Sequence, residues 1–295
     1  MDAPPRHKSL ATVHCRKIKV NHRIGHVLHM PDGKQIIIYS WNGSFRNWDL
    51  ETGTQVGEQW ADKDRGVKTM VLSPDGKKVA SGSFDGAVKL WSVETGKVIT
   101  TWTGHTKGVR CVCWSSDGGR VVSGFKDGTF RVRNVESGRT ILGPINTGEY
   151  MWAVCYSPDA KMIATGGNGL KIWDANSGEL LKSFEGKFSC LAWTLDGKTL
   201  FAGGSGITKI DTATWIVLDL CENYVNAISV SPNERILTST SFVDTTAQLW
   251  NLDTNQPIGT PLHYPDYVMS ATFSADGQFL VTSCFDSHIY TWDVF

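Results

Sequence analysis

The sequence predicts an all-β fold of radial or barrel architecture, built from seven copies of one unit of about 40 residues. Three observations predict it. A turn tetrapeptide related to Ser-Pro-Asp-Gly recurs along the chain, and a second marker position recurs in step with it. Between these markers the apolar residues alternate over short runs, as in strands, and no helical period is present.

The clearest copy of the unit runs from Lys77 to Gly96. Apolar and small residues alternate up to Ser83 and again from Val88, and Asp85-Gly86 lies between the two runs. Asp-Gly between alternating segments is a strong hairpin signal, because both central residues of a type I′ turn need a positive φ. The copy is therefore predicted to contain a hairpin with a two-residue turn.

Two independent sets of positions give the number of copies. The turn tetrapeptides are Met30-Pro31-Asp32-Gly33, Ser73-Pro74-Asp75-Gly76, Ser115-Ser116-Asp117-Gly118, Ser157-Pro158-Asp159-Ala160, Thr194-Leu195-Asp196-Gly197, Ser231-Pro232-Asn233-Glu234 and Ser274-Ala275-Asp276-Gly277. The second-strand markers are Trp48, Trp91, Arg133, Trp173, Ile210, Trp250 and Trp292. Because both sets repeat with the same period, seven units are predicted.

Each unit is expected to form four strands, a to d, in chain order. Strand a precedes the turn tetrapeptide, strands b and c form the hairpin, and strand d follows a Glu-Thr-Gly type of turn, as in Lys97 to Trp102 and Glu179 to Phe184. The last copy ends just after its strand c. We expect part of Ala11 to Val20 to supply the missing strand, because an unpaired strand edge invites aggregation. Residues 1–10 are expected to be a flexible tail, and residues 11–295 a single domain.

This pattern resembles the WD-repeat family. Trp48-Asp49, Trp173-Asp174 and Trp292-Asp293 carry the dipeptide that names the family, and Gly104-His105 matches its Gly-His. The resemblance implies a seven-bladed β-propeller with one four-stranded blade per repeat, in which His, Ser or Thr, Trp and Asp are often linked by hydrogen bonds. It assigns structural roles to His105, Asp85, Asp127, Asp244, Asp286, Trp48, Trp91, Trp173, Trp250 and Trp292.

The linked histidine is clear in one copy only. That copy carries Arg133 in place of the tryptophan, so the network around His105 is expected to be incomplete. His263 is a second candidate for the histidine position. Packing between blades, more than these networks, is therefore expected to stabilise the ring.

Composition narrows the function. Lys plus Arg and Asp plus Glu both number 29, and this neutral balance argues against a nucleic-acid binder. No apolar run or leader indicates a membrane span or secretion. The seven cysteines form no disulfide framework, which favours the reducing cytoplasm, with the nucleus left open. Cys111 and Cys113 share a strand face, but other copies carry Ala, Ser, Thr or Val there, so neither a metal nor a cofactor is expected. No catalytic motif is found, so no enzyme is predicted.

Three columns of equivalent residues predict a binding face. They are the residue that opens strand a, the residue two positions later, and the residue before the hairpin Asp or Asn, a column to which the sixth copy contributes Val243. In the resembling family these columns surround the central channel, where partners dock. The partner-binding candidates are the aromatic and cationic members: Arg23, Trp41, Lys68, Phe84, Arg110, Lys126, Tyr150, Trp152, Lys187, Tyr224, Tyr267 and Phe285.

The favoured interpretation is a non-catalytic interaction scaffold that is monomeric as an isolated domain. It would bind a peptide or protein that carries acidic or phosphorylated groups beside apolar ones. Two alternatives stay open. Gly259 to Leu262, with the related Gly143-Pro144-Ile145, resembles repeats of multidomain nucleotide-switch receptors, which suggests a recognition module of a larger protein. The other alternative is that the protein binds a small molecule or sugar in the channel or is an enzyme.

Overall fold

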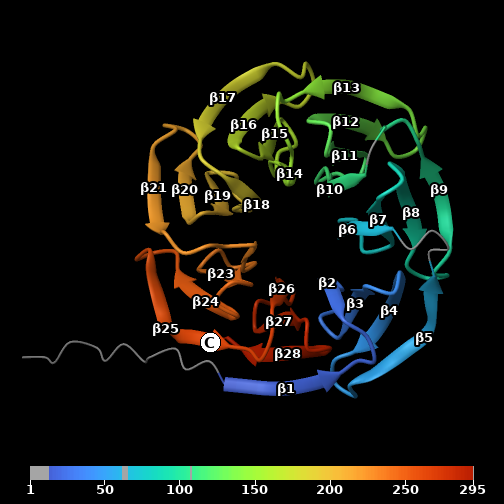
Figure 1. Cartoon of the computed structure of the whole chain (residues 1–295), viewed down its shortest axis with the longest axis vertical. Coiled ribbons are helices and arrows are strands. Elements are labelled where there is room, and N and C mark those ends of the chain that lie inside the picture. Colours follow the sequence, from blue (N-terminus) through green and yellow to red (C-terminus); the bar gives the residue numbers. More distant parts are fainter. Residues whose placement is uncertain (1–12, 62–65, 107, 295) are drawn as a thin grey trace, which may run out of the picture.

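Seven sheets, each of four antiparallel strands, surround a central axis in the computed structural model (Figure 1). The structure describes residues 13–61, 66–106 and 108–294, with the backbone alone for residues 13–15. The predicted tail, residues 1–10, lies outside the described residues. The all-β propeller fold and its seven four-stranded blades are confirmed.

Within each blade, strand a lies next to the central axis, strands b and c follow, and strand d lies at the outer rim (Figure 1). Strands a are β2 (Ile24–His29), β6 (Val67–Leu72), β10 (Val109–Trp114), β14 (Ala153–Tyr156), β18 (Phe188–Trp193), β22 (Ala227–Val230) and β26 (Val268–Phe273). Strands b are β3 (Gln35–Ser40), β7 (Lys78–Ser83), β11 (Arg120–Phe125), β15 (Met162–Gly166), β19 (Thr199–Gly204), β23 (Ile236–Ser241) and β27 (Phe279–Cys284). Strands c are β4 (Ser44–Asp49), β8 (Val88–Ser92), β12 (Thr129–Asn134), β16 (Gly169–Asp174), β20 (Ile207–Asp211), β24 (Thr246–Asn251) and β28 (His288–Asp293). Strands d are β5 (Thr54–Ala61), β9 (Val98–Trp102), β13 (Thr140–Asn146), β17 (Leu180–Glu185), β21 (Val217–Cys221), β25 (Gln256–His263) and β1 (Val13–Lys19).

The ring closes through its first strand. β1 pairs antiparallel with β28, from Val13 opposite Asp293 to Lys19 opposite His288, and so becomes the outer strand of the seventh blade. The expectation for Ala11 to Val20 is thereby confirmed for its described part. Because β28 gains β1 as a partner, it is an interior strand of the seventh blade, as strand c is in the other blades.

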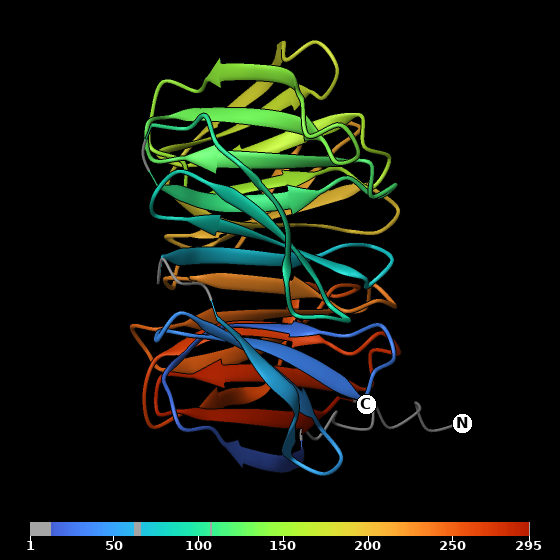
Figure 2. The ribbon, with the colours of Figure 1, turned by 90° about the vertical axis from the view of Figure 1, so that its right-hand side faces the viewer.

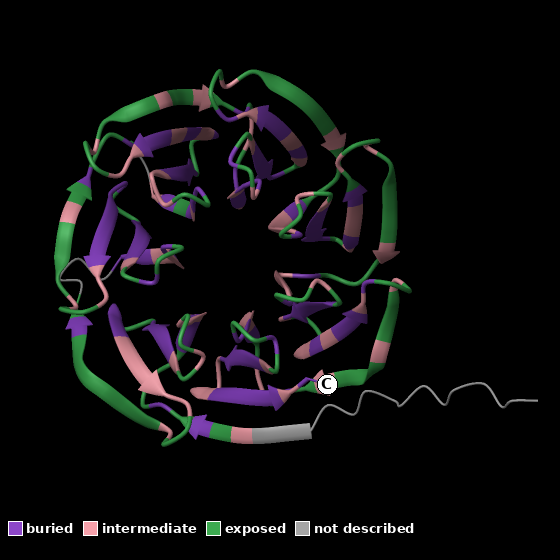
Figure 3. Ribbon diagram, turned by 180° about the vertical axis from the view of Figure 1, so that it is seen from behind, coloured by how far each residue is buried: buried purple, intermediate pink, exposed green. Residues whose placement is uncertain are grey.

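Burial is greatest in strands b, lower in strands a next to the channel, and lowest in the outer strands at the rim (Figure 3). Every residue of β3 after Gln35 is buried, whereas β17 is exposed along nearly its whole length. Small residues in strands b let neighbouring blades approach: a Cβ added to Gly82 would lie 2.5 Å from Cγ1 of Val109 in the next blade. Contact between blades therefore supplies the core of the molecule.

The outer strands run obliquely across the rim (Figure 2) and connect successive blades. The side chain of Trp60, from the first blade, lies against Gly96 in the c–d turn of the second. Trp102 lies in the same way against Gly138 of the third blade. Both glycines have positive φ, 65° for Gly96 and 67° for Gly138, so glycine serves the turn and makes room for the indole ring.

At the closing seam an arginine takes the place of these tryptophans. Arg16 of β1 lies against Gly53 in the c–d turn of the first blade. Its guanidinium donates to the carbonyl oxygens of Leu50 and Thr52, both at 2.9 Å, and to that of Glu51. The seam is therefore fixed by charge-assisted hydrogen bonds in addition to the strand pairing.

The predicted two-residue turn at Asp85-Gly86 is wrong. Gly86 has a φ of 90°, but Asp85 does not have a positive φ. The amide of Gly86 donates to Ser83, and the amide of Ser83 donates to Ala87, so the loop contains three residues. This is the turn-plus-bulge hairpin, in which only the last loop residue needs a positive φ.

The tryptophan part of the expected network is formed in four blades. The indole nitrogens of Trp91, Trp173 and Trp250 donate at 2.9 Å to Ser81, Thr165 and Ser239, and that of Trp292 donates at 3.2 Å to Thr282. Trp48 departs from the pattern, since its buried Nε1 has no partner among the described residues.

His105 forms only part of the network. Its Nε2 is 2.8 Å from Ser123 Oγ, and its ring stacks on Phe125 with the centroids 3.6 Å apart. Arg133 donates instead to the carbonyl oxygen of Thr103. Burial lowers the pKa of His105 to about 3, with smaller contributions from the cations Arg133 and Arg131, so the imidazole is neutral at pH 7. The expectation of an incomplete network is consistent with this geometry.

The prediction that His263 occupies the histidine position of the network is wrong. His263 is exposed on β25, and the next residue, Tyr264, is buried. Tyr264 Oη is 2.9 Å from Thr282 Oγ1, which also accepts from Trp292. A tyrosine thus occupies the place expected for the histidine.

The hairpin aspartates act locally. Asp85 and Asp127 accept hydrogen bonds from backbone amides of their own turns, and Asp244 bonds to Ser241. Asp286 accepts from the hydroxyl of Tyr290 at 2.7 Å, and its Oδ2 lies 3.1 Å from Nδ1 of His288. These bonds stabilise the hairpins, and the four aspartates form no network with a described histidine of the His105 type.

Candidate binding face around the channel

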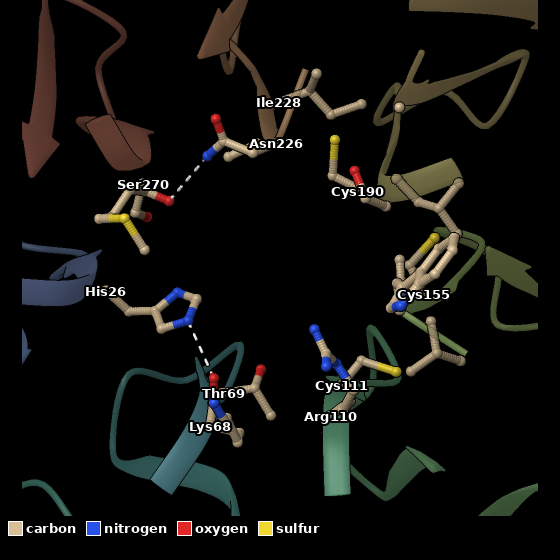
Figure 4. A pocket seen from close by; sticks show the side chains of 18 of the residues that line it. His26, Lys68, Thr69, Arg110, Cys111, Cys155, Cys190, Asn226, Ile228 and Ser270 are labelled. Atoms are coloured by element: carbon tan, nitrogen blue, oxygen red, sulfur yellow. Dashed lines mark hydrogen bonds between the residues drawn. The ribbon is translucent and has the colours of Figure 1, made fainter. Parts of the chain in front are cut away.

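Strands a surround a central cavity of about 850 Å³ (Figure 4). Five of the twelve predicted partner-binding residues line it: Lys68, Arg110, Trp152, Lys187 and Tyr224. The remaining seven lie at the starts of strands a or in the b–c hairpins at the same end of the blades. The predicted residues therefore share one face, which we call the channel face.

A backbone hydrogen bond brings two of the predicted columns together. In the first and seventh blades, the residue that follows strand b donates its amide to the residue that opens strand a of the same blade. Trp41 donates to Arg23 at 2.9 Å, and Phe285 donates to Tyr267 at 2.8 Å. The columns lie apart in the sequence, but the blade places them in direct contact.

Five rings form a continuous series across blades six, seven and one, which we call the aromatic arc. Its members in order are Tyr224, Phe242, Tyr267, Phe285 and Trp41. Successive centroids lie 4.9, 6.0, 6.1 and 5.9 Å apart. Three members are strongly exposed, Trp41 at 54%, Tyr267 at 49% and Tyr224 at 37%. Rings at these separations attract one another and fix a common surface.

The sequence missed Phe242. Counting back from Asp244 selected Val243, but the connection between β23 and β24 contains four residues, 242–245, whereas those of the first, third and seventh blades contain three. Phe242 directly follows the last residue of β23, as Trp41 follows that of β3. Counting from the strand end would have found it. The structure places Phe242 between Tyr224 and Tyr267, and Val243 is not part of the arc.

Two cations of the chain lie over these rings. The guanidinium of Arg23 is 4.4 Å from the Phe285 centroid. Lys68 Nζ is 5.6 Å from the centroid of Trp41 and 4.2 Å from that of Phe84. Lys68 therefore connects Phe84, which is 58% exposed, to the end of the arc.

Three cations gather where the arc ends, namely Lys68, Arg110 and Lys126. Partial burial lowers the pKa of Lys68, and the positive charges of Arg110 and Lys126 lower it further. Within residues 13–61, 66–106 and 108–294, none of the three forms an ion pair with a carboxylate. We call them the cation cluster.

Tyr150 and Trp152 of the fourth blade lie apart from the arc. Tyr150 is 53% exposed, and Trp152 lines the channel. Among the described residues no ring contact links either of them to the arc. The predicted residues thus divide into an aromatic sector on blades six, seven and one and a mixed sector on blades two to five.

The channel interior offers little reactive chemistry. Nε2 of His26 is 3.2 Å from the carbonyl oxygen of Lys68, and burial lowers the pKa of this histidine (Figure 4). Burial raises the pKa of Cys113 to about 11 and that of Cys190 to about 12, so both are protonated and weakly nucleophilic. The described residues contain no group of three or more His, Cys, Asp or Glu side chains suited to a metal ion. Nor do they contain a helix long and apolar enough to cross a membrane.

Comparison with family models identifies the repeat. The model described as WD domain, G-beta repeat matches residues 55–92, 96–134, 138–174, 217–251 and 255–293, more than half of the chain. Each matched segment begins in or next to the outer strand of one blade and ends in strand c of the next. A search of curated proteins finds no match.

Proposed function

The chain belongs to the WD-repeat family, and on that basis we propose that it is a non-catalytic scaffold whose channel face binds a peptide segment or a partner protein. Propellers of this family generally serve as protein-interaction scaffolds. Fold alone does not define a function, however, so the proposal depends on the chemistry of the face.

The aromatic arc is the observation that carries the proposal. Large rings are exposed on it, yet they are held by contacts with one another, so little side-chain entropy is lost when a partner covers them. Aromatic residues and arginine are the types most enriched at binding hot spots. A structural role alone would not require Trp41 and Tyr267 to expose about half of their surfaces.

The charges indicate the chemistry of the partner. Arg23 and Lys68 extend over ring faces at the rim of the channel. Such cations present positive charge next to apolar surface. A partner that fits both would carry acidic or phosphorylated groups beside apolar side chains.

A second candidate is supported by the channel itself. Its volume of about 850 Å³ is within the range of small-molecule sites, and apolar side chains contribute much of its lining. A metabolite or sugar that stabilises the protein against heat would favour this function. The segments that suggested a receptor module, Gly143-Pro144-Ile145 and Gly259 to Leu262, lie in the outer strands β13 and β25, away from the channel face.

The proposal includes a location and an assembly state. We propose that the protein acts in the cytoplasm or nucleus and that the isolated domain is monomeric. The six described cysteines are free, which is compatible with a reducing compartment.

Quantitative capture of partners tests the proposal. We would compare the protein with a Trp41→Ala, Tyr267→Ala double variant and with an Ile216→Ala control, in which an exposed side chain of the rim is truncated. Partners of the channel face should be depleted about tenfold or more by the double variant and retained by the control. If the folded double variant captures the same partners at the same levels, the arc is not the binding surface.

A further inference from the structure

The cation cluster is assembled from two blades. Lys68 belongs to β6 of the second blade, whereas Arg110 belongs to β10 of the third and Lys126 to its b–c hairpin. The start of β10 abuts the second hairpin: a Cβ added to Gly108 would lie 3.1 Å from the Cα and carbonyl oxygen of Phe84. This contact joins the second and third blades beside Phe84, and Lys68 and Arg110 line the same cavity at this junction.

Among the residues that the structure describes, no carboxylate forms an ion pair with the cluster. Asp85 and Asp127 belong to the same two hairpins, and each has its Oδ1 bonded to its own turn, to the amides of Ala87 and Thr129 respectively. The second oxygen of Asp127 accepts from the hydroxyl of Thr106 at 3.4 Å. The pKa of Lys68 is lowered first by burial and then by the positive charges of Arg110 and Lys126, both of which repel its ammonium group.

Such an arrangement is unfavourable in the free protein. Three like charges close to one another repel, and one of them is partly removed from water. Arg110 and Lys126 are exposed, so they could have turned away into solvent. An anion placed among them would relieve the repulsion and accept hydrogen bonds from all three side chains.

The number of cations favours a phosphate group over a carboxylate. A phosphate monoester carries about two negative charges at pH 7 and has three acceptor oxygens, whereas a carboxylate has one charge and two oxygens. The guanidinium of Arg110 suits two-point recognition, and each lysine adds a point charge. Phe84 and Trp41, which both lie within cation–π distance of Lys68, extend the site toward the arc.

We propose that Lys68, Arg110 and Lys126 bind the phosphate of a phosphorylated residue in the partner segment, while the aromatic arc binds apolar residues on one side of it. This inference rests on the proposed function, since it assigns the chemistry of the partner at the same face. The segment runs from the cation cluster over Phe84 and along the arc toward Tyr224. Affinity for the partner is therefore controlled by phosphorylation.

Degenerate peptide libraries test this inference directly. Each library has random flanking positions and one fixed central residue, which is serine, phosphoserine or glutamate, and binding is followed by fluorescence anisotropy. The phosphoserine library should bind about tenfold or more tightly than the serine library, and more tightly than the glutamate library. Arg110→Gln with Lys126→Gln should remove this preference, and since both side chains are exposed the fold should persist.

A matched control changes the same charge elsewhere. Lys97→Gln with Lys182→Gln alters two exposed lysines at the outer side of the ring and should leave the phosphoserine preference intact. Equal binding of the three libraries, no binding of the phosphoserine library, or a preference that survives in the Arg110, Lys126 variant overturns the inference. Competition by inorganic phosphate as effective as that by the phosphoserine library would also overturn it, because the site would then be specific for a free ion.

The libraries also separate this inference from the proposed function. If all three libraries bind equally and the Trp41→Ala, Tyr267→Ala variant binds none of them, the arc binds peptides and the phosphate assignment alone is wrong. If the arc variant still captures every partner of the unaltered protein, the proposed function fails as well.

Discussion

Lowering the pH should reduce the stability of the folded protein, because the buried His105 is held in its neutral form. The folded protein holds the pKa of this imidazole at about 3, whereas in the unfolded chain it has an ordinary value of about 6.5. Below pH 6.5 the unfolded state therefore binds a proton that the folded state does not. Stability from this residue is fully present above pH 6.5 and is lost as the pH falls toward 3.

The size of the effect follows from the two pKa values. Between pH 7 and pH 5 the difference in proton binding lowers the free energy of unfolding by about 2 kcal/mol. His105→Gln removes the titrating group together with the ring that stacks on Phe125. At pH 7 the variant should be less stable than the unaltered protein by about 1–3 kcal/mol. At pH 5 this gap should shrink by about 2 kcal/mol.

Urea unfolding followed by tryptophan fluorescence at both pH values measures the gap. Carboxylates of lowered pKa, such as Asp75 and Asp117, are charged throughout this range and affect both proteins equally. His22→Gln, at an exposed position, serves as the control and should change stability by about 0.5 kcal/mol or less at either pH. A gap between the protein and the His105 variant that stays constant or widens at pH 5 would refute the reasoning.

Four further changes test the fold. Gly96→Ala should cost about 2–4 kcal/mol in urea unfolding, because φ is 65° and the new Cβ would lie 2.1 Å from Trp60 Cδ1. Gly33→Ala, with φ 72° and no atom within 4 Å, should cost only the backbone part, about 1 kcal/mol; equal losses would exclude the packing argument. Trp250→Ala should lower stability by about 3–5 kcal/mol, and a calorimetric midpoint near that of the unaltered protein would contradict it. Deletion of residues 1–20 should make the protein insoluble or lower its midpoint sharply; an unchanged melting curve would mean that β1 does not stabilise the ring.

The sequence predicted the blades because their determinants are local. Alternating strands, turn tetrapeptides and the Trp-Asp dipeptides each act within a few residues, and their repetition gave seven units. The closing strand followed by counting, since Ala11 to Val20 had no other partner. Local reasoning failed where one extra residue changed the hairpin after β23, so Val243 was chosen for its column in place of Phe242.

The twelve binding candidates were selected by column, and the sequence could not show which of them meet. Trp41 and Phe285 are almost a full chain apart, yet their rings touch because β1 closes the ring and brings the first and seventh blades together. Tyr150 and Trp152 satisfied the same sequence criteria but lie in another sector.

Residue order and local patterning thus determined the fold, the number of blades and the types of residue at the channel face. Only the tertiary structure decided that five rings join into one arc and that Lys68 of the second blade interacts electrostatically with Arg110 and Lys126 of the third. The physical reason is that contacts between blades depend on the curvature and closure of the whole ring. No segment of the chain contains that information by itself.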